Sequence, residues 1–397
     1  MKRLKGMAAV CVVVGVLACW VEGQVKWELK AMAGPPKVWP ATQASEPGMR
    51  AIFYEGLPWK GKPTRVFGWF GLPKGYSGGK APAMVLIHGG GGTSCTRWVR
   101  LWNERGYAAI SMDLCGKAFG KTDGQGTRHD TAGPSGWDDS FGQIDWPIED
   151  QWTYHAVADA VLANSLLRSL PEVDAERIGV TGISWGGYLT SIVAGVDDRF
   201  RFAVPVYGCG FLGEGSVWAG RFKSMGEAKA GQWLSNWDPS QYLEAAKMPM
   251  LWVTGEVDFA YPLASVRKSY RLAKGERYLS VQPGMQHSHP AGEVPAEIGA
   301  FADQMLRGGL PLAQCVKQGM DGRKMWAIFA NKVQLIKAAA VYTKDDGAWQ
   351  KRKWVVAEAE LEKGRASFAV PEGVAAAYLM VVDERKLVAS SEHEELK

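Results

Sequence analysis

The sequence predicts an α/β protein in which a mostly parallel sheet, with helices on both faces, precedes a small β-sandwich. Short apolar runs alternate with amphipathic stretches from about residue 64 to residue 308, which is the pattern of parallel strands joined by crossover helices. Beyond residue 309 the helical pattern stops and short strand-like segments dominate. A chain of 397 residues is also long enough for two domains.

The predicted strands of the first part are continuous apolar runs, as expected for strands that are buried on both faces. They lie at 83–87, 107–112, 177–181, 202–207, 250–254 and 278–281. Apolar residues at helical spacing predict a long helix at 149–169 and a last helix at 295–306. Strands and helices therefore alternate up to the end of this part.

The second part is predicted to contain only strands. They lie at 325–330, 335–343, 352–362, 366–370 and 377–382. Turn signals, such as Asp-Asp-Gly at 345–347, separate them. This spacing favours an immunoglobulin-like β-sandwich. We therefore expect an N-terminal leader at 1–23, an α/β domain at 24–309 and the sandwich at 310–397.

The N-terminus predicts export to the periplasm or the medium. Cations at positions 2, 3 and 5 precede an apolar stretch at 7–20, which is short for a membrane span and typical of a signal-peptide core. Cleavage before Gln24 is the favoured route. The residues up to Cys19 also resemble a lipoprotein box, so a membrane is expected as a partner only if Cys19 is lipidated.

Composition disfavours nucleic acid as a partner. Hydrophobic residues make up 47% of the chain and charged residues 22%, which is ordinary for a soluble globular protein. The formal charge of +5 is spread along the sequence, whereas nucleic-acid binders cluster their cations.

After the leader, four cysteines remain, and none forms a CxxC pair: Cys95, Cys115, Cys209 and Cys315. A zinc knuckle or a thioredoxin-type site is therefore not indicated. Disulfides and small buried thiols both remain open.

The motif GISWGG at 182–187 has the context of a nucleophile elbow, because it follows a predicted strand and opens a predicted helix. In such an elbow the turn is so tight that its flanking residues must be small, as Gly182 and Gly186 are. The nucleophile would be Ser184, held at a helix N-terminus where unpaired N–H groups stabilise negative charge.

A base and an acid follow in loops after later strands. Asp258 comes after the strand at 250–254, and His287 comes after the strand at 278–281. The order serine, acid, histidine is the one expected for this elbow. His289 is the competing base and is otherwise expected to line the site. Glu256 is the competing acid and is otherwise expected to be solvated or to support the site from behind.

The oxyanion formed during acyl transfer needs backbone N–H donors that are already in place. One donor is expected from Trp185, after the nucleophile, and the other from Gly90 in the glycine-rich loop HGGGG at 88–92. The loop lacks the Lys-Ser/Thr of a phosphate-binding P-loop. His88 is expected to hold the loop, and no metal or organic cofactor is required.

The segments HGGG at 88–91, GISWGGY at 182–188 and DFAYP at 258–262 resemble those of bacterial acetylxylan esterases and dienelactone hydrolases, in the α/β-hydrolase superfamily. They are also similar to the catalytic domain of prolyl oligopeptidases. The resemblance covers about residues 60–308. It implies a serine esterase that acts on carboxylic esters, above all on acylated carbohydrate.

Two features separate the chain from these relatives. Dienelactone hydrolases use a cysteine where this chain has Ser184, and prolyl oligopeptidases have a propeller upstream, where fewer than 70 residues precede this sheet. An exported peptidase and an inert carbohydrate-binding protein remain the alternatives.

Aromatic and acidic residues surround the expected site. The tryptophans suit a sugar cleft or a packed core: Trp98, Trp102, Trp137, Trp146, Trp185 and Trp218. The acids suit a cation or a solvated loop: Asp138, Asp139, Asp145 and Glu149. Core packing and solvation are the simpler interpretations.

Overall fold

The structure is a computed structural model that describes residues 25–396. The predicted leader, with Cys19, lies outside these residues. Within the described range, no helix combines the length and the apolar character that a membrane span needs.

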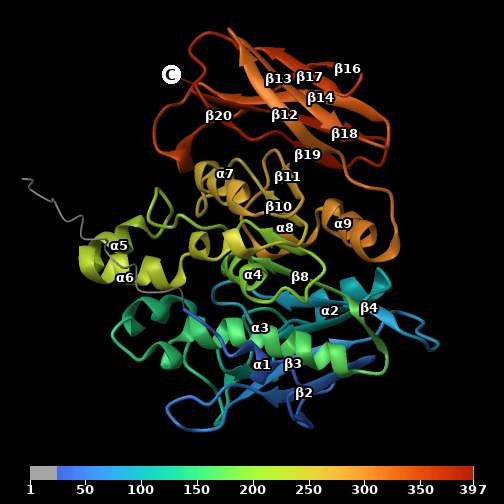
Figure 1. Cartoon of the computed structure of the whole chain (residues 1–397), viewed down its shortest axis with the longest axis vertical. Helices are drawn as coiled ribbons and strands as arrows, with labels where there is room; N and C mark the ends of the chain where they lie inside the picture. Colours follow the sequence, from blue (N-terminus) through green and yellow to red (C-terminus); the bar gives the residue numbers. More distant parts are fainter. Residues whose placement is uncertain (1–24, 397) are drawn as a thin grey trace, which may run out of the picture.

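A nine-stranded sheet forms the centre of the molecule, in the order β1-β2-β3-β5-β4-β8-β9-β10-β11 (Figure 1). The strands from β5 to β11 in this order are parallel to one another. They are β4 (Ala81–Ile87), β5 (Ala108–Met112), β8 (Val173–Ile183), β9 (Ala203–Val206), β10 (Met250–Thr254) and β11 (Arg277–Val281). Each of the six predicted apolar runs overlaps one of these strands, which confirms the mostly parallel sheet.

Three antiparallel strands extend the sheet at its N-terminal edge and were not predicted. They are β1 (Val38–Pro40), β2 (Met49–Glu55) and β3 (Arg65–Gly71). In β2, the second strand from this edge, only Tyr54 is buried, so it has no continuous buried apolar run. A short ribbon of β6 (Lys117–Ala118) and β7 (Thr127–Arg128) lies outside the main sheet.

Helices cover both faces of the sheet. Helices α3 (Trp152–Ser169) and α4 (Trp185–Val196) pack against each other and against β8. Helices α2 (Thr96–Glu104) and α9 (Ala296–Arg307) lie together on the other face, where Arg307 donates to the carbonyl of Arg105. The remaining helices are α1 (Leu29–Met32), α5 (Ala219–Met225), α6 (Glu227–Trp237), α7 (Leu263–Leu272) and α8 (His289–Glu293). Short 3₁₀ helices are η1 (Trp137–Gln143), η2 (Ile148–Asp150), η3 (Pro239–Gln241), η4 (Leu243–Ala245) and η5 (Trp349–Lys351).

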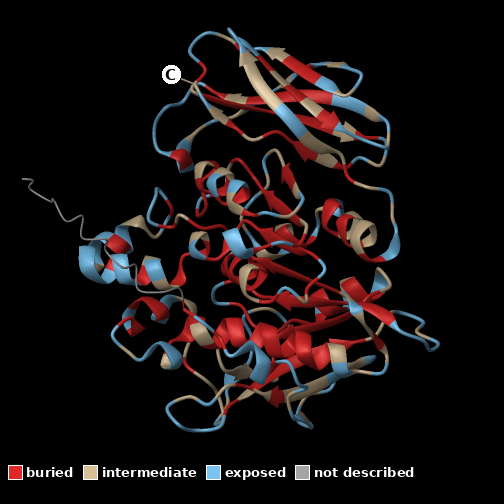
Figure 2. Cartoon of the chain, in the orientation of Figure 1, coloured by how far each residue is buried: buried red, intermediate tan, exposed pale blue. Residues whose placement is uncertain are grey.

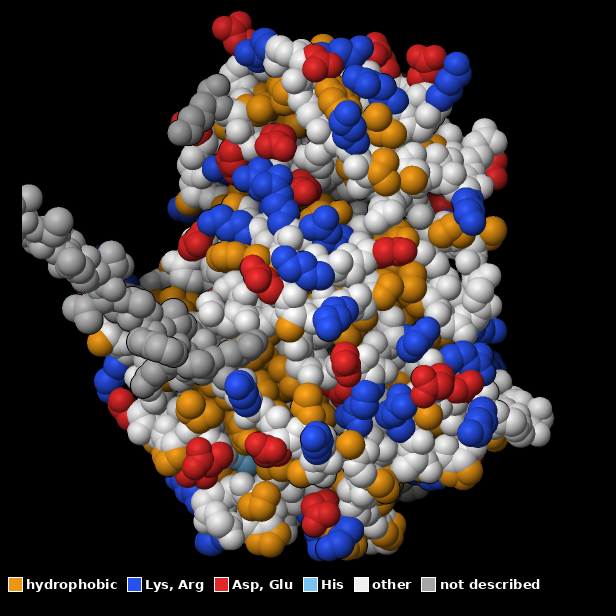
Figure 3. All heavy atoms as spheres, in the orientation of Figure 1, with side chains coloured by type: hydrophobic (Ala, Val, Ile, Leu, Met, Phe, Trp, Pro, Cys, Tyr) orange, Lys and Arg blue, Asp and Glu red, His pale blue; other side chains and the backbone are white. Residues whose placement is uncertain are grey.

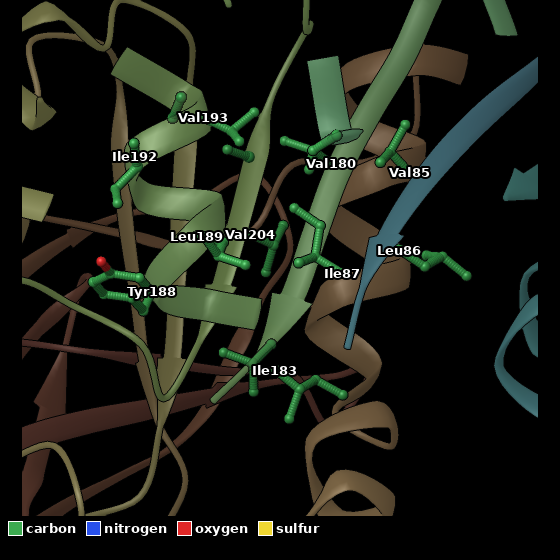
Figure 4. Close-up of a cluster of buried hydrophobic side chains, with 14 of the residues drawn as sticks. Val85, Leu86, Ile87, Val180, Ile183, Tyr188, Leu189, Ile192, Val193 and Val204 are labelled. Atoms are coloured by element: carbon green, nitrogen blue, oxygen red, sulfur yellow. The ribbon is translucent and has the colours of Figure 1, made fainter. Parts of the chain in front are cut away.

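The core lies between these helices and the central strands, which are buried along most of their length (Figure 2). All seven residues of β4 are buried. Side chains such as Ile87, Val180 and Val204 belong to one buried cluster with Leu189 and Ile192 of α4 (Figure 4). At about 25 cal/mol per Å² of buried apolar surface, packing of this kind is the main force that holds a helix on a sheet. It fixes α4, and therefore the turn that precedes α4, against the strands.

The C-terminal part is a sandwich of two antiparallel sheets. One sheet has the order β12-β13-β17-β16, and the other has β15-β14-β18-β19, with β20 paired to β18. Their bounds are β12 (Gln314–Asp321), β13 (Lys324–Ala330), β14 (Leu335–Thr343), β15 (Val355–Glu358), β16 (Glu360–Glu362), β17 (Arg365–Ala369), β18 (Ala376–Asp383), β19 (Val388–Ser390) and β20 (Glu394–Glu395). The predicted fold class is confirmed.

The single strand predicted at 352–362 is wrong. The chain leaves β15 in one sheet and enters β16 in the other. Ala359 lies between them, largely buried, with its N–H donated to the carbonyl of Ala338. Strands that change sheets at a corner of a sandwich do so through such a bend, which hydrophobic patterning does not reveal.

The β14–β18 sheet is buried on both faces. Ala338 and Ala340 of β14 point into the core of the sandwich, whereas the alternate residue Val341 belongs to the core of the α/β domain. On β18, Leu379 likewise points inward and Tyr378 points to the α/β domain. Because side chains alternate along a strand, this one sheet joins the two parts through a continuous apolar interface.

Charge is evenly distributed on the face shown in Figure 3, where cationic and anionic side chains are interspersed. Many of the ion pairs join exposed side chains, such as Lys229 with Asp145 and Lys324 with Glu360. This face has no extended single-sign patch of the kind that nucleic-acid binders present.

Candidate active site

Ser184 lies on a strained turn between β8 and α4. Its backbone has φ +60° and ψ −117°, a region that residues with side chains rarely occupy. A Cβ on Gly182 would lie 2.2 Å from the carbonyl oxygen of Gly186, and a Cβ on Gly186 would lie 1.9 Å from that of Ile87. Both glycines are therefore required by close backbone approach, and the turn exposes the Ser184 hydroxyl at the start of α4.

His287 contacts Ser184 from the loop that follows β11. Its Nε2 atom lies 2.8 Å from the Ser184 hydroxyl oxygen, and its Nδ1 atom lies 2.7 Å from Oδ2 of Asp258. A carboxylate accepts hydrogen bonds only, so Nδ1 holds the proton and Nε2 is free to accept from the serine. This arrangement can remove the serine proton as the hydroxyl attacks a carbonyl carbon.

Asp258 is fully buried in the loop after β10. Its Oδ1 atom accepts the backbone N–H groups of Ala260 and Tyr261, both at 2.7 Å. These donors stabilise the charge of the carboxylate and fix its orientation toward His287.

Aromatic rings surround His287, and the sequence alone did not indicate them. Tyr207 stacks on the imidazole at 4.4 Å between ring centroids, and its hydroxyl donates to the carbonyl of Gln286. Phe259 packs against the same ring at 4.8 Å and is half exposed. Tyr207 directly follows β9, so its place at the carboxyl end of a strand was the signal available in the sequence.

The glycine-rich loop after β4 lies against the elbow. A Cβ on Gly89 would lie 3.3 Å from that of Ser184, and a Cβ on Gly90 would lie 2.8 Å from Cδ1 of Trp185. The loop backbone therefore borders the space in front of the serine, where an oxyanion would form.

His88 holds this loop. Its Nε2 atom accepts the N–H of Leu114 at 3.0 Å, so its Nδ1 atom bears the proton and donates to the carbonyl of Gly89 at 2.8 Å. Both ring nitrogens are thus engaged in buried contacts away from Ser184, as expected for a structural histidine.

Two family models match the chain. The acetyl xylan esterase (AXE1) family matches residues 50–214, and the prolyl oligopeptidase family matches residues 143–306. The acetyl xylan esterase from Paenibacillus sp. R4 is similar in structure, with a TM-score of 0.57, 23% identity, and coverage of 70% of this chain and 92% of that one. The chain is a member of the α/β-hydrolase superfamily.

Further relatives of this hydrolase include an esterase and two peptidases. Acetyl xylan esterase 1 from Thermoanaerobacterium sp. JW/SL YS485 has a TM-score of 0.51 and 18% identity, over 70% of this chain and 91% of that one. The acylaminoacyl peptidase of Pyrococcus horikoshii has a TM-score of 0.50 and 20% identity, over 71% and 44%. Dipeptidyl-peptidase 5 of Porphyromonas gingivalis is 26% identical over 220 residues. That alignment covers 48% of the hydrolase chain and 28% of the peptidase.

The competing base and acid of the hydrolase have other hydrogen-bond partners. His289 pairs through Nδ1 with the buried Glu293, which also accepts two hydrogen bonds from Arg97. Glu256 accepts the N–H of Gly284 at 2.8 Å. Only 3% of Glu256 is exposed, so of its two expected positions the solvated one is wrong, and the buried one behind the site agrees with the structure.

The tryptophans of the hydrolase are mostly packing residues. Trp102 and Trp185 are almost fully buried. Trp185 lies at the centre of an aromatic cluster with Trp137 and Trp218, at 6.2 and 5.1 Å between ring centroids. Trp137 also borders Gly90, so this cluster forms the wall behind the elbow.

Two of the four acidic residues near the site pair with cations of α5 and α6. Asp138 pairs with Arg221, and Asp145 pairs with Lys229. In the described part of the hydrolase, no group of three or more His, Cys, Asp or Glu side chains is arranged to hold a metal ion.

The four cysteines in the described residues are free thiols. Burial raises the pKa of Cys115 and Cys209, and nearby carboxylates raise it further. Thiols with raised pKa values stay protonated and are poor nucleophiles, so neither residue competes with Ser184.

Proposed function

We propose that this chain is an exported serine esterase that removes small acyl groups from carbohydrate, with Ser184, His287 and Asp258 as its catalytic triad. One observation supports the proposal above all. The hydrogen bonds from Ser184 to His287 and from His287 to Asp258, at 2.8 and 2.7 Å, join three loops in the geometry that serine hydrolases need.

In the proposed mechanism, His287 takes the proton of Ser184 as the serine oxygen attacks the ester carbonyl. Asp258 holds the imidazole and stabilises its cationic form. The N–H groups of Trp185 and Gly90 stabilise the oxyanion, and each such donor contributes about 3–4 kcal/mol. His287 then protonates the leaving alcohol, and it later activates the water that hydrolyses the acyl-enzyme.

Similarity to acetyl xylan esterases supports the choice of ester substrate. The structural match covers 92% and 91% of the two esterases. The half-exposed ring of Phe259 and the partly exposed Trp137 and Trp218 offer flat surfaces on which a sugar ring can pack.

A peptidase is the second candidate, and a specific observation favours it. The prolyl oligopeptidase family model matches residues 143–306, which include all three triad residues. An inert carbohydrate-binding protein is disfavoured, because such a protein has no need for a buried, hydrogen-bonded acid behind a histidine.

A substrate panel distinguishes these functions. Wild-type protein and Ser184→Ala are assayed with acetylated xylan, aryl acetates, feruloyl esters and proline peptides. The esterase proposal predicts faster turnover of acetyl esters than of peptides, and its loss in Ser184→Ala. Faster peptide turnover supports the peptidase, and failure to hydrolyse any substrate supports the binding protein.

Export forms a separate part of the proposal, since the leader lies outside the described residues. We infer cleavage before Gln24, which leaves the described domains in the exported product. Intact-mass analysis of protein recovered from the producing cells tests this. A mature chain that begins at Gln24 supports simple cleavage, whereas a lipid-bearing Cys19 supports membrane anchoring.

A further inference from the structure

The short helix that follows the histidine loop is held by the helix that follows the glycine-rich loop. Arg97 of α2 donates from Nη1 to Oε2 and from Nη2 to Oε1 of Glu293, the last residue of α8, with the second bond at 2.9 Å. Only 1% of the Glu293 side chain is exposed, against 53% of the Arg97 side chain. A buried carboxylate needs a paired charge, and two parallel bonds from one guanidinium also fix its orientation. Arg97 therefore fixes the end of α8 against α2.

His289, the first residue of α8, completes this contact. Its Nδ1 atom lies 2.7 Å from Oε1 of Glu293, which accepts the Nδ1 proton. Its ring meets the buried ring of Trp98 edge-on, with 4.9 Å between the ring centroids. Since Trp98 and Arg97 are neighbours in α2, both ends of α8 contact α2. We call Arg97, Glu293 and His289 the α8 clamp.

Helix α8 also contacts the elbow and continues directly from the histidine loop. A Cβ on Gly292 of α8 would lie 2.9 Å from Cγ2 of Ile183, the residue before the nucleophile. Only Ser288 separates His287 from α8. The Ser288 hydroxyl caps the helix by accepting the N–H of Ala291 at 3.2 Å. The place of α8 therefore sets the direction in which the chain leaves His287.

We propose that the α8 clamp positions His287 relative to Ser184 and to the glycine-rich loop. This inference rests on the proposed function. Helix α2 begins at Thr96, shortly after the glycine-rich loop at 88–92, so the clamp joins the segments that supply an oxyanion donor and the base. The three residues are positioning residues, since they act through α8. A displacement of about 1 Å in a catalytic group can cost on the order of 100-fold in rate, so loss of the clamp slows chemistry more than it weakens binding.

The first test removes the guanidinium in Arg97→Ala. For an aryl acetate, kcat is expected to fall about tenfold with KM within about twofold of wild type. The rate constant for labelling of Ser184 by a fluorophosphonate falls by the same factor. Because the Arg97 side chain is half exposed, free guanidinium ion can enter the position that the variant leaves open. Guanidinium chloride at a non-denaturing concentration is expected to restore most of the lost kcat, whereas sodium chloride and urea at the same concentration are not.

A second set of variants tests the clamp even if Arg97→Ala does not fold. Glu293→Gln keeps the size of the side chain and removes its charge, and kcat is expected to fall at least about threefold. Arg97→Lys keeps the charge but lacks the fork of donors, so its kcat should lie between those of wild type and Arg97→Ala. Because the two residues form one contact, the double variant Arg97→Ala/Glu293→Gln is expected to be no slower than the slower single variant.

Arg100 offers a matched control on the same helix. It lies one turn beyond Arg97, its side chain is 46% exposed, and it donates to Glu46, outside α8. Arg100→Ala therefore removes a similar ion pair that does not involve the clamp. Its labelling rate and kcat are expected to equal those of wild type, with or without guanidinium. Melting temperatures are recorded for every variant, which separates loss of stability from loss of alignment.

The outcomes are distinguishable from failure of the proposed function. If Ser184→Ala abolishes turnover but Arg97→Ala and Glu293→Gln keep the wild-type kcat and labelling rate, the positioning role is overturned and the esterase stands. The role is also overturned if Arg100→Ala slows labelling as much as Arg97→Ala does, or if Arg97→Ala changes KM alone. If Ser184→Ala retains turnover, the proposed function itself fails.

Discussion

Oδ2 of Asp258 lies 2.7 Å from Nδ1 of His287, while Oδ1 of the same carboxylate accepts two backbone N–H groups. The side chain is fully buried, so these contacts replace the water that would otherwise solvate its charge. The carboxylate can only accept from Nδ1, and this fixes the tautomer in which Nε2 faces Ser184. The function of the serine therefore depends on a group that it does not touch.

Replacing this carboxylate by an amide tests that dependence. In Asp258→Asn the amide can donate to Nδ1 and favour the wrong tautomer, so kcat is expected to fall about 10⁴-fold with little change in folding. Steady-state kinetics with an aryl acetate measure the effect. The control is Asp198→Asn, which alters an exposed carboxylate and should keep wild-type activity. An Asp258→Asn enzyme within tenfold of wild type would refute the role of Asp258.

The order of site residues could be predicted because each follows a strand with a clear apolar run. Parallel strands end at one edge of a sheet, so Ser184, Asp258 and His287 had to lie near one another. The sequence left Glu256 either solvated or buried behind the site, and it could not decide between them, because it does not show that the distant C-terminal sandwich packs on the α/β domain. Strand β2, next to the edge strand β1, was missed because only one of its side chains is buried and it gives no strong apolar signal.

The elbow should be intolerant of any side chain at Gly186. A Cβ there would lie 1.9 Å from the carbonyl oxygen of Ile87, so Gly186→Ala must displace α4 or β4. We expect a loss of more than about 3 kcal/mol in unfolding free energy, or no folded protein. Denaturant unfolding measures this.

The matched control for this substitution is Gly231→Ala. Gly231 lies in α6, and a Cβ there meets nothing within 4 Å. Alanine in place of a helical glycine should raise stability by about 0.5–1 kcal/mol. Equal stability of the two alanine variants would contradict the packing described for the elbow.

Stability should fall in mild acid because histidines are buried in neutral form. Burial, with help from Arg267 and two other arginines, lowers the pKa of His393 from 6.5 to about 3. The unfolded chain therefore binds a proton that the folded chain excludes. Above about pH 6.5 this histidine does not lower the free energy of unfolding, because it is neutral in both states. As the pH falls from 6.5 toward 3, the free energy of unfolding decreases, by about 2 kcal/mol at pH 5.

Thermal unfolding from pH 7 to pH 4 measures this effect. His393→Gln should flatten the decline in melting temperature. Burial also lowers the pKa of His155 to about 4, so the variant should keep part of the decline. A melting temperature of the wild type that is constant over this range, or an equally steep decline in His393→Gln, would contradict the assignment.

The central claim is that Ser184 is the nucleophile, and covalent labelling tests it most directly. Wild-type protein is treated with a fluorophosphonate, which loses fluoride when a serine oxygen attacks phosphorus, and the adduct is located by peptide mass spectrometry. We predict one adduct per chain, on Ser184, with loss of esterase activity in proportion to labelling and no adduct in Ser184→Ala. A fully active labelled enzyme, or equal labelling of Ser184→Ala, would contradict the account.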